Sequence, residues 1–204
     1  MSKILDLYVD IKESEQRFVD EVFEAEIYRA ACPQLTIIDA GAYEGEFAFY
    51  CYNFAKKIYA LEPDPRPWKV LKDRVKKFDL DDRIKILDKA LAKDTGERYF
   101  NATGFGGSRI IGEQDEVHQS EDKIKVKTIS LQDLTTKYKI EQVDILKLDI
   151  EGGEAEVIRS SEFPKLSKKI KVIIGEHLEP VKGLLEELGY KSRDVKGGNT
   201  LYER

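Results

Sequence analysis

Two glycines and three carboxylates lie close together in the stretch TIIDAGAYEGEF, residues 36–47. Apolar residues lead into Asp39, and Gly41 and Gly45 follow, with Glu44 and Glu46 beside the second glycine. Glycines allow a tight turn and a close approach of the backbone to a ligand. A glycine-rich turn after a buried strand is typical of nucleotide-binding proteins, so the stretch predicts a nucleotide-binding loop that carries negative charge.

A further carboxylate, Glu62, ends the apolar stretch KKIYAL. An acidic residue about 20 positions beyond a glycine loop accepts hydrogen bonds from the ribose hydroxyls of adenosine ligands. A carboxylate would repel a 2′-phosphate, so NADP is not expected. NAD and S-adenosylmethionine (SAM) remain as candidate ligands.

The charge of the glycine loop favours SAM over NAD. NAD would place a pyrophosphate beside Glu44 and Glu46, and like charges repel strongly in a partly dry site. SAM carries a sulfonium and an ammonium group, and Asp39 is placed to meet the ammonium. The spacing D-x-G-x-x-x-G also differs from the dinucleotide fingerprint G-x-G-x-x-G. An NAD-dependent enzyme of similar fold is the alternative.

A second acidic cluster follows another apolar stretch, in VDILKLDIEGGEAEVI, residues 143–158. Asp149 and Glu151 are two residues apart, so on an extended strand they point the same way. The next apolar stretch, KVIIGEHL, ends in Glu176 and His177. Converging carboxylates and an imidazole suit proton transfer, so Asp149, Glu151 and His177 are candidate bases and Glu176 a candidate substrate contact. Two alternatives are oxygen ligands for a divalent metal, which we do not predict, and hydrogen bonds to the backbone of adjoining loops.

The elements that must position these residues alternate between short apolar stretches and helical patterns. This alternation predicts an α/β fold with a doubly wound, mainly parallel sheet, in which ligands bind at the carboxyl ends of the strands. The expected strands are 35–40, 57–61, 83–87, 143–150 and 171–175. The expected helices are 45–55, 65–79, 152–160 and 178–188.

Three further segments accompany this core. Residues 97–100 and 124–129 alternate polar and apolar types and predict a small extra β-hairpin, while YKSRD and NTLYER predict a hairpin at the edge of the sheet. The long loop 101–122 predicts a lid over the acceptor, with Ser108 and Arg109 as substrate-binding residues. The alternative interpretation of Arg109 is an ordinary surface arginine.

The amino-terminal residues 3–31 show helical spacing of apolar side chains. We expect residues 1–34 to form a helical extension and residues 35–204 one catalytic domain. We expect this extension either to cover the ligand site or to form a homodimer contact.

The bulk composition bounds the class of protein. The chain has 204 residues, a net charge of −5 and 36% charged residues, a proportion typical of heat-adapted proteins. The acidic balance argues against a nucleic-acid partner. No apolar stretch is long enough for a membrane span, and the charged amino terminus does not resemble a signal peptide, so we expect a cytoplasmic protein. Cys32 and Cys51 are expected to be buried thiols, with a disulfide as the alternative.

These motifs together resemble the FkbM family of SAM-dependent methyltransferases. IIDAGAYEGEF, YALEPDP, ILDKALAKDTGE, DILKLDIEGGEAEVI and GEH occur in that order, and KLDIEGGE is the most specific of them. The resemblance implies a Rossmann-like sheet of seven strands with an antiparallel last strand, SAM as the methyl donor and a hydroxyl acceptor on a sugar or another small metabolite. The implied partner is thus a small-molecule or glycan acceptor.

The resemblance also implies roles for individual residues. Asp39, Gly41 and Gly45 would surround the methionine part of SAM, and Glu62 would hold the ribose. Asp88 and Lys89, in ILDKAL, would lie beside the adenine, while Asp149 and Glu151 would face the methyl group and the acceptor. Tyr43 departs from the family pattern, which usually has Asn at this position. A non-catalytic module that binds SAM or docks a partner is the remaining alternative.

Overall fold

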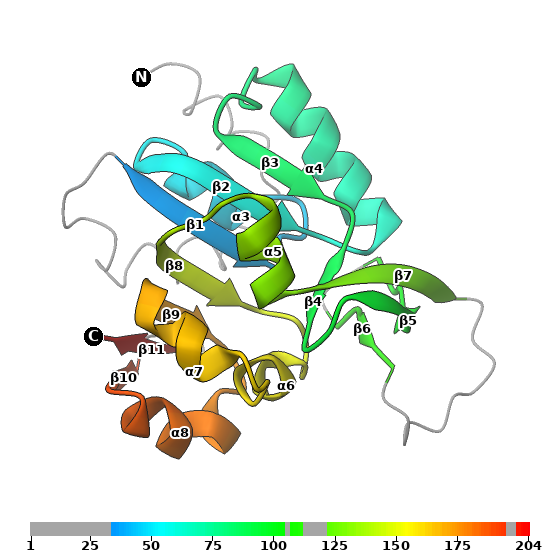
Figure 1. The fold of residues 1–204 in the computed structure, drawn as a ribbon. Helices are drawn as coiled ribbons and strands as arrows, with labels where there is room; N and C mark the ends of the chain where they lie inside the picture. The colour runs from blue at the N-terminus through cyan, green and yellow to red at the C-terminus, as the bar shows by residue number, and fades with distance from the viewer. Residues whose placement is uncertain (1–33, 105–106, 112–121, 195–198) are drawn as a thin grey trace.

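The computed structural model describes residues 34–104, 107–111, 122–194 and 199–204 (Figure 1). Its main sheet has seven strands in the order β10-β11-β9-β8-β1-β2-β3. β11 is antiparallel to both of its neighbours, and the pairs from β9 across to β3 are parallel. The sequence prediction of a mainly parallel sheet with an antiparallel last strand is confirmed. The strands are β1 (Leu35–Ala40), β2 (Ala55–Leu61), β3 (Ile84–Leu87), β8 (Val143–Leu148), β9 (Ile170–Gly175), β10 (Lys191–Asp194) and β11 (Thr200–Glu203).

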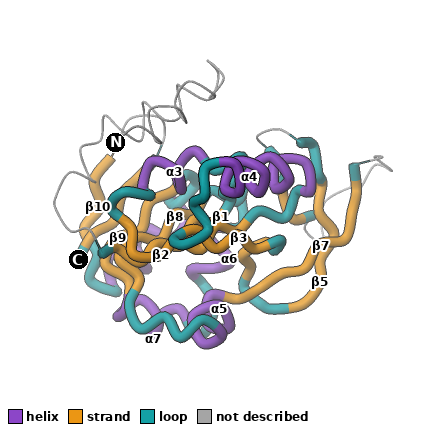
Figure 2. The backbone as a smooth tube through the Cα atoms, turned by 90° about the horizontal axis from the view of Figure 1, so that it is seen from above, coloured by secondary structure: helices purple, strands orange, loops and turns teal. Residues whose placement is uncertain are grey.

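Helices cover both faces of this sheet, as Figure 2 shows from above. One face is covered by α3 (Glu46–Cys51) and α4 (Pro65–Lys77). The other is covered by α5 (Leu131–Lys137), α6 (Glu154–Ile158), α7 (Phe163–Leu166) and α8 (Lys182–Glu187), with the 3₁₀ turns η1 (Ser167–Lys169) and η2 (Glu179–Val181).

The apolar core follows from the alternation of side chains along buried strands. In β1, Ile37 belongs to the core cluster under α3 and α4, while its neighbour Ile38 belongs to the cluster under the opposite helices. Both side chains are fully buried. Strands covered on two faces need apolar residues at successive positions, which explains the near-continuous apolar stretches in the sequence.

A second sheet lies beside the carboxyl ends of the main strands. It contains β4 (Ala90–Ala92), β5 (Gly96–Asn101), β6 (Arg109–Ile110) and β7 (Lys123–Ser130), in the order β4-β7-β5-β6. The predicted hairpin is present as the antiparallel pair β5 and β7. Two short strands that the sequence analysis did not predict extend it on either side.

Several predicted boundaries were wrong for local reasons. The helix expected at 45–55 ends at Cys51, because the next residues turn and β2 starts at Ala55. The helix expected at 152–160 starts at Glu154, whose carboxylate accepts the N–H groups of Ile150 and Gly152 and so fixes a turn before the helix. The helix expected at 178–188 is divided into η2, which contains Pro180, and α8, which starts at Lys182.

The helix α5 was missed, although its start has a clear signal. The Ser130 side chain accepts the N–H of Asp133, which is the contact that a helix N-cap makes. The predicted amino-terminal helices and Cys32 lie outside the described residues. In the part of the chain that the structure describes, no helix has the length and apolar character needed to cross a membrane.

The strand order fixes where a ligand can bind. β1 is flanked by β2, which follows it in sequence, and by β8, which comes much later. The order of the strands therefore reverses at β1, and in such sheets the crevice beyond the strand ends at this point is the usual ligand site.

Candidate active site

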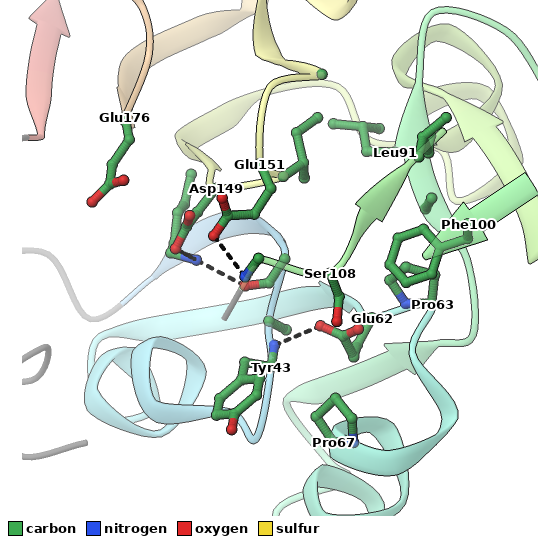
Figure 3. A pocket seen from close by; sticks show the side chains of 18 of the residues that line it. Tyr43, Glu62, Pro63, Pro67, Leu91, Phe100, Ser108, Asp149, Glu151 and Glu176 are labelled. Atoms are coloured by element: carbon green, nitrogen blue, oxygen red, sulfur yellow. Dashed lines mark hydrogen bonds and ion pairs between the residues drawn. The ribbon is translucent and has the colours of Figure 1, made fainter. Parts of the chain in front are cut away.

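One pocket opens at the carboxyl ends of β1, β2, β8 and β9 and has a volume of about 410 Å³. This volume lies within the range of small-molecule sites. Figure 3 shows an apolar end, marked by Pro63, Leu91 and Phe100, and an acidic end, marked by Asp149, Glu151 and Glu176, with Glu62 between them. The other lining residues are Gly41, Ala42, Tyr43, Glu46, Phe47, Pro67, Ala90, Gly107, Ser108, Ile110, Lys147, Ile150 and Gly153.

The glycine loop forms the inner wall of the pocket. Gly41 has a φ of 77°, and a Cβ atom there would lie 1.7 Å from the carbonyl oxygen of Asp149. Glycine is therefore required at this position by the close approach of the β8 backbone. Gly45 has a φ of 100°, and a Cβ there would collide with Leu71 and Phe49. Gly45 does not line the pocket, so it shapes the loop from behind.

Tyr43 adopts a left-handed conformation with a φ of 48°, which costs a residue with a side chain about 1–2 kcal/mol. Its N–H donates to Glu62 Oε2 at 2.8 Å, and the residue lines the pocket. Asn tolerates this conformation better than most residues, which accounts physically for the Asn that the family pattern has here.

Glu62 lies between the two ends of the pocket with 5% of its surface exposed. Its oxygens accept the N–H groups of Tyr43 and Asp64, each at 2.8 Å. Burial raises the pKa of Glu62 to about 7, against the lowering effect of these two hydrogen bonds. A carboxylate offers about four lone-pair positions, so Glu62 can still accept the two hydroxyl groups of a ribose.

Glu44 and Glu46 lie in a largely buried cluster beside the glycine loop. They do not point to solvent, because their side chains are 13% and 5% exposed. Arg74 of α4 pairs with both, at 3.0 Å to Glu44 and 3.2 Å to Glu46. The arginine offsets much of their charge, so the repulsion of a pyrophosphate that they were expected to provide is weaker than the sequence suggested. The negative charge of the pocket comes mainly from its other carboxylates.

Lys147, which the sequence analysis did not single out, lies at the floor of the acidic end. Its Nζ donates to the carbonyl oxygen of Gly41 at 2.9 Å and lies 3.3 Å from both Asp39 Oδ1 and Asp149 Oδ2. Burial acts to lower the pKa of Lys147, but the two carboxylates outweigh it and raise that pKa above its ordinary value. Lys147 is therefore a permanent cation between two acids.

Asp39 lies beneath the pocket and does not line it. Its side chain is fully buried, and burial raises the pKa of this carboxyl against the opposing effect of Lys147. The place beside Asp39 that the sequence analysis assigned to a ligand ammonium is taken by Lys147. Asp149, with its side chain 24% exposed, is the member of this group that faces the pocket as predicted.

Glu151 lines the acidic end and adopts a left-handed conformation with a φ of 55°. Its Oε1 accepts the N–H of Gly107 at 3.0 Å. The hydrogen bond to an adjoining loop, which was the alternative to catalysis at this residue, is therefore present. It ties the end of β8 to the segment that precedes β6.

Ser108 lines the pocket, but its hydroxyl is engaged in holding the same segment. It donates to Asp64 Oδ2 at 2.9 Å and also accepts the N–H of Thr103 at 3.0 Å. Asp64 is fully buried and accepts the N–H of Gly104 as well. Arg109, the first residue of β6, is exposed and does not line the pocket.

Glu176 and His177 follow β9 at the open side of the acidic end. Glu176 lines the pocket with 35% of its side chain exposed. His177 is 61% exposed and lies outside the lining, with its Nε2 3.8 Å from Glu176 Oε2. Asp149, Glu151 and Glu176 therefore line the same end of the pocket, whereas His177 does not line it.

The apolar end fits a flat aromatic ring better than the predicted residues suggest. Asp88 is exposed, and neither it nor Lys89 lines the pocket. The next two residues, Ala90 and Leu91 of β4, line it instead. The lining residues thus come two positions after the predicted pair, in the strand β4, which the sequence did not predict.

Taken together, the residues present fit an adenosyl cation. The apolar end suits an adenine, Glu62 suits the ribose, and the carboxylates of the acidic end suit a positively charged sulfur and ammonium. Among the described residues, no group of three or more His, Cys, Asp or Glu side chains is arranged to hold a metal ion.

Comparison with known proteins agrees with this geometry. Residues 39–192 match the profile of the Methyltransferase FkbM domain. The chain is similar to Methyltransferase sdnD of Sordaria araneosa, with 27% identity over 90% of this chain and 85% of that protein. Two solved structures share its fold. The METTL16 MTase domain has a TM-score of 0.55 and 13% identity over 95% of this chain and 69% of that one. The N-terminal domain of human METTL16 has a TM-score of 0.50 and 13% identity over 93% and 68%.

Proposed function

Because the chain belongs to the FkbM family of SAM-dependent methyltransferases, we propose that it methylates a hydroxyl group of a sugar or of another small metabolite. Methyl transfer from SAM is the activity of the family, and the hydroxyl acceptor is the further step proposed here. The acceptor is either a free small molecule or the sugar of a glycan.

The observation that supports a hydroxyl acceptor is the grouping of carboxylates at one end of the pocket. Asp149, Glu151 and Glu176 all line this end, on the opposite side of Glu62 from the apolar residues. A hydroxyl is a poor nucleophile and loses a proton as it attacks, so a carboxylate within reach assists the reaction.

Asp149 is the residue proposed to take that proton, at a carboxylate oxygen that faces the pocket. Lys147 fixes the position of the Asp149 side chain, and Glu176 is placed to accept a hydrogen bond from a second hydroxyl of the acceptor. Glu151 is already engaged with Gly107, and His177 lies outside the lining, so both are weaker candidates for the base.

The remaining lining residues serve to orient the donor. SAM, when bound, supplies a methyl group attached to a positively charged sulfur. Glu62 and the apolar end would hold its adenosine part, and the carboxylates of the acidic end would attract its charge. Holding two reactants in line is worth roughly 7–11 kcal/mol of the barrier, so orientation would contribute much of the catalysis.

The test is transfer of radiolabelled methyl groups from SAM to a panel of monosaccharides, nucleotide sugars and small hydroxylated metabolites. We expect a product methylated on oxygen, located by NMR, and loss of transfer in Asp149→Asn with SAM binding retained in part. Methylation of a nitrogen or carbon atom would contradict the proposal. SAM binding without transfer to any acceptor would favour the non-catalytic alternative.

A further inference from the structure

Lys147 is the one lysine that lines the described pocket, and its position within β8 is unusual for a charged residue. It lies directly opposite Asp39 of β1 in the parallel register, on the sheet face that carries Ile37 and Ile145. Only 5% of its surface is exposed. A buried charge costs several kcal/mol unless it is well paired, so this lysine needs specific partners.

Those partners are three oxygen-bearing groups around the ammonium of Lys147, one as a hydrogen-bond acceptor and two as ion-pair partners. Gly41 supplies a carbonyl oxygen from the glycine loop, Asp39 a carboxylate from the end of β1, and Asp149 a carboxylate from the end of β8. Lys147 thus links the carboxyl ends of β1 and β8. The acidic part of the pocket lies beside these two strand ends.

The two carboxylates beside Lys147 are not equivalent. Asp39 is fully buried, and neither of its oxygens accepts a well-directed hydrogen bond from the residues that the structure describes. Asp149 is partly exposed and lines the pocket. Asp39 therefore serves as an internal counter-charge, whereas Asp149 is presented to the ligand.

Stability alone does not explain this arrangement. An apolar pair of similar volume at the buried positions is often as stable as an ion pair, or more so, because it avoids the cost of removing two charges from water. The charge of Lys147 is therefore better explained by a role at the pocket, which is lined by its partner Asp149.

We propose that Lys147 is a positioning residue, which holds the Asp149 carboxylate and the Gly41 carbonyl in the geometry that SAM binding and methyl transfer require. The proposal rests on the function proposed above. It gives Asp39 the separate role of balancing the charge of the lysine.

A double variant separates positioning from charge balance. Lys147→Met alone leaves Asp39 buried without its counter-charge and is expected to be strongly destabilised. Lys147→Met/Asp39→Asn removes one positive and one negative charge together, so the net charge beside the pocket is the same as in the wild type. Any loss of SAM affinity in the double variant is then due to position and not to electrostatic attraction.

The measurements are thermal unfolding, calorimetric titration with SAM and with S-adenosylhomocysteine, and the rate of methyl transfer. We expect the double variant to recover most of the stability lost in Lys147→Met. We also expect it to bind SAM more weakly than the wild type, on the order of tenfold, and to lose at least as much in kcat. Asp39→Asn alone keeps Lys147 in contact with Asp149 and is expected to retain more SAM affinity than the double variant.

A double variant that is stable, binds SAM like the wild type and transfers at the wild-type rate would overturn the proposal, because Lys147 would then only neutralise Asp39. Binding and stability need no acceptor, so they test Lys147 even if no hydroxyl compound is methylated. Failure of the wild type to methylate hydroxyl compounds would instead count against the proposed function.

Discussion

Glu151 Oε1 accepts the backbone N–H of Gly107 at 3.0 Å, which joins the end of β8 to the segment before β6. Close by in the chain, the Gly104 N–H and the Ser108 hydroxyl donate hydrogen bonds to Asp64. Two carboxylates from different strand ends therefore fix one stretch of backbone along the pocket. This contact gives Glu151 a role that does not depend on proton transfer.

Glutamine at position 151 distinguishes this role from catalysis. Glu151→Gln keeps an oxygen that can accept the Gly107 N–H but cannot act as a base. We expect it to retain most of the methyl-transfer rate, whereas Glu151→Ala should lower it about tenfold, since a hydrogen bond to a charged group is worth about 1.5–3 kcal/mol. Glu156→Gln, on the exposed side of α6, is a matched control. Equal loss of transfer in the Gln and Ala variants would instead support a catalytic base.

Gly41→Ala should disrupt the pocket because the added Cβ would lie 1.7 Å from the carbonyl oxygen of Asp149. We expect a loss of about 3 kcal/mol or more in the free energy of unfolding, together with loss of SAM binding. Urea unfolding and calorimetry measure the two effects.

Gly183→Ala is the control for this substitution. Nothing lies within 4 Å of a Cβ at Gly183, which is inside α8, so alanine there should stabilise the protein by about 0.5–1 kcal/mol. If Gly41→Ala bound SAM normally, the close approach of the two backbones would not be needed for the site.

Tyr43→Asn should relieve backbone strain in the glycine loop. We expect a gain of about 1 kcal/mol in stability, because Asn adopts the left-handed conformation more readily than Tyr. The loss of the aromatic ring from the pocket lining should change the affinity for SAM as well. Thermal unfolding and calorimetry follow both quantities.

Lys139→Gly serves as the comparison. Lys139 also has a left-handed conformation, with a φ of 53°, and follows α5 away from the pocket. We expect a similar gain in stability with unchanged SAM affinity. A destabilised Tyr43→Asn variant would mean that contacts of the tyrosine ring outweigh the strain.

Binding of SAM should weaken as the pH falls through about 7. Burial raises the pKa of Glu62 to about 7, and the protonated carboxyl is a poorer acceptor for two ribose hydroxyls. We expect about tenfold weaker binding at pH 6 than at pH 8 if only the ionised form binds well. Calorimetry between pH 6 and 8 measures how the affinity for SAM depends on pH. In Glu62→Gln this dependence should be much weaker. A constant wild-type affinity between pH 6 and 8 would exclude this role for Glu62.

The same carboxyl should affect stability with the opposite trend. Its pKa in the folded protein lies above the ordinary value of 4.5, so the fold disfavours the ionised form. The penalty is absent below about pH 4.5, grows as the pH rises and is complete above about pH 7, where it amounts to about 3 kcal/mol. The free energy of unfolding of the wild type, relative to Glu62→Gln, should therefore fall across that interval in urea titrations.

The sequence predicted the sheet well because its strands are covered on both faces and stand out as apolar stretches between helices. Glu62, which was predicted at the end of a strand next to β1, follows β2 and lines the pocket, while its contact with a ribose stays a prediction.

Contacts between side chains of distant elements were harder to predict from the sequence. Arg74 of α4 pairs with both Glu44 and Glu46, and no local sequence pattern predicts that contact. Lys147 opens the motif KLDIEGGE, but its contacts depend on the strand register that places it opposite Asp39. Asp88 and Lys89 were assigned from the family resemblance alone, whereas the pocket is lined by Ala90 and Leu91 of the neighbouring strand β4.

The contact between Lys147 and the Gly41 carbonyl joins residues that are 106 positions apart in the chain. During synthesis, the glycine loop is therefore made long before the strand that completes it. No adenosyl compound can assist the early stages of folding through the whole site, because the acidic end of the pocket does not yet exist. Once the central strands have paired, the ligand stabilises the finished protein by mass action, so a rise in melting temperature with SAM reports that the whole sheet has assembled.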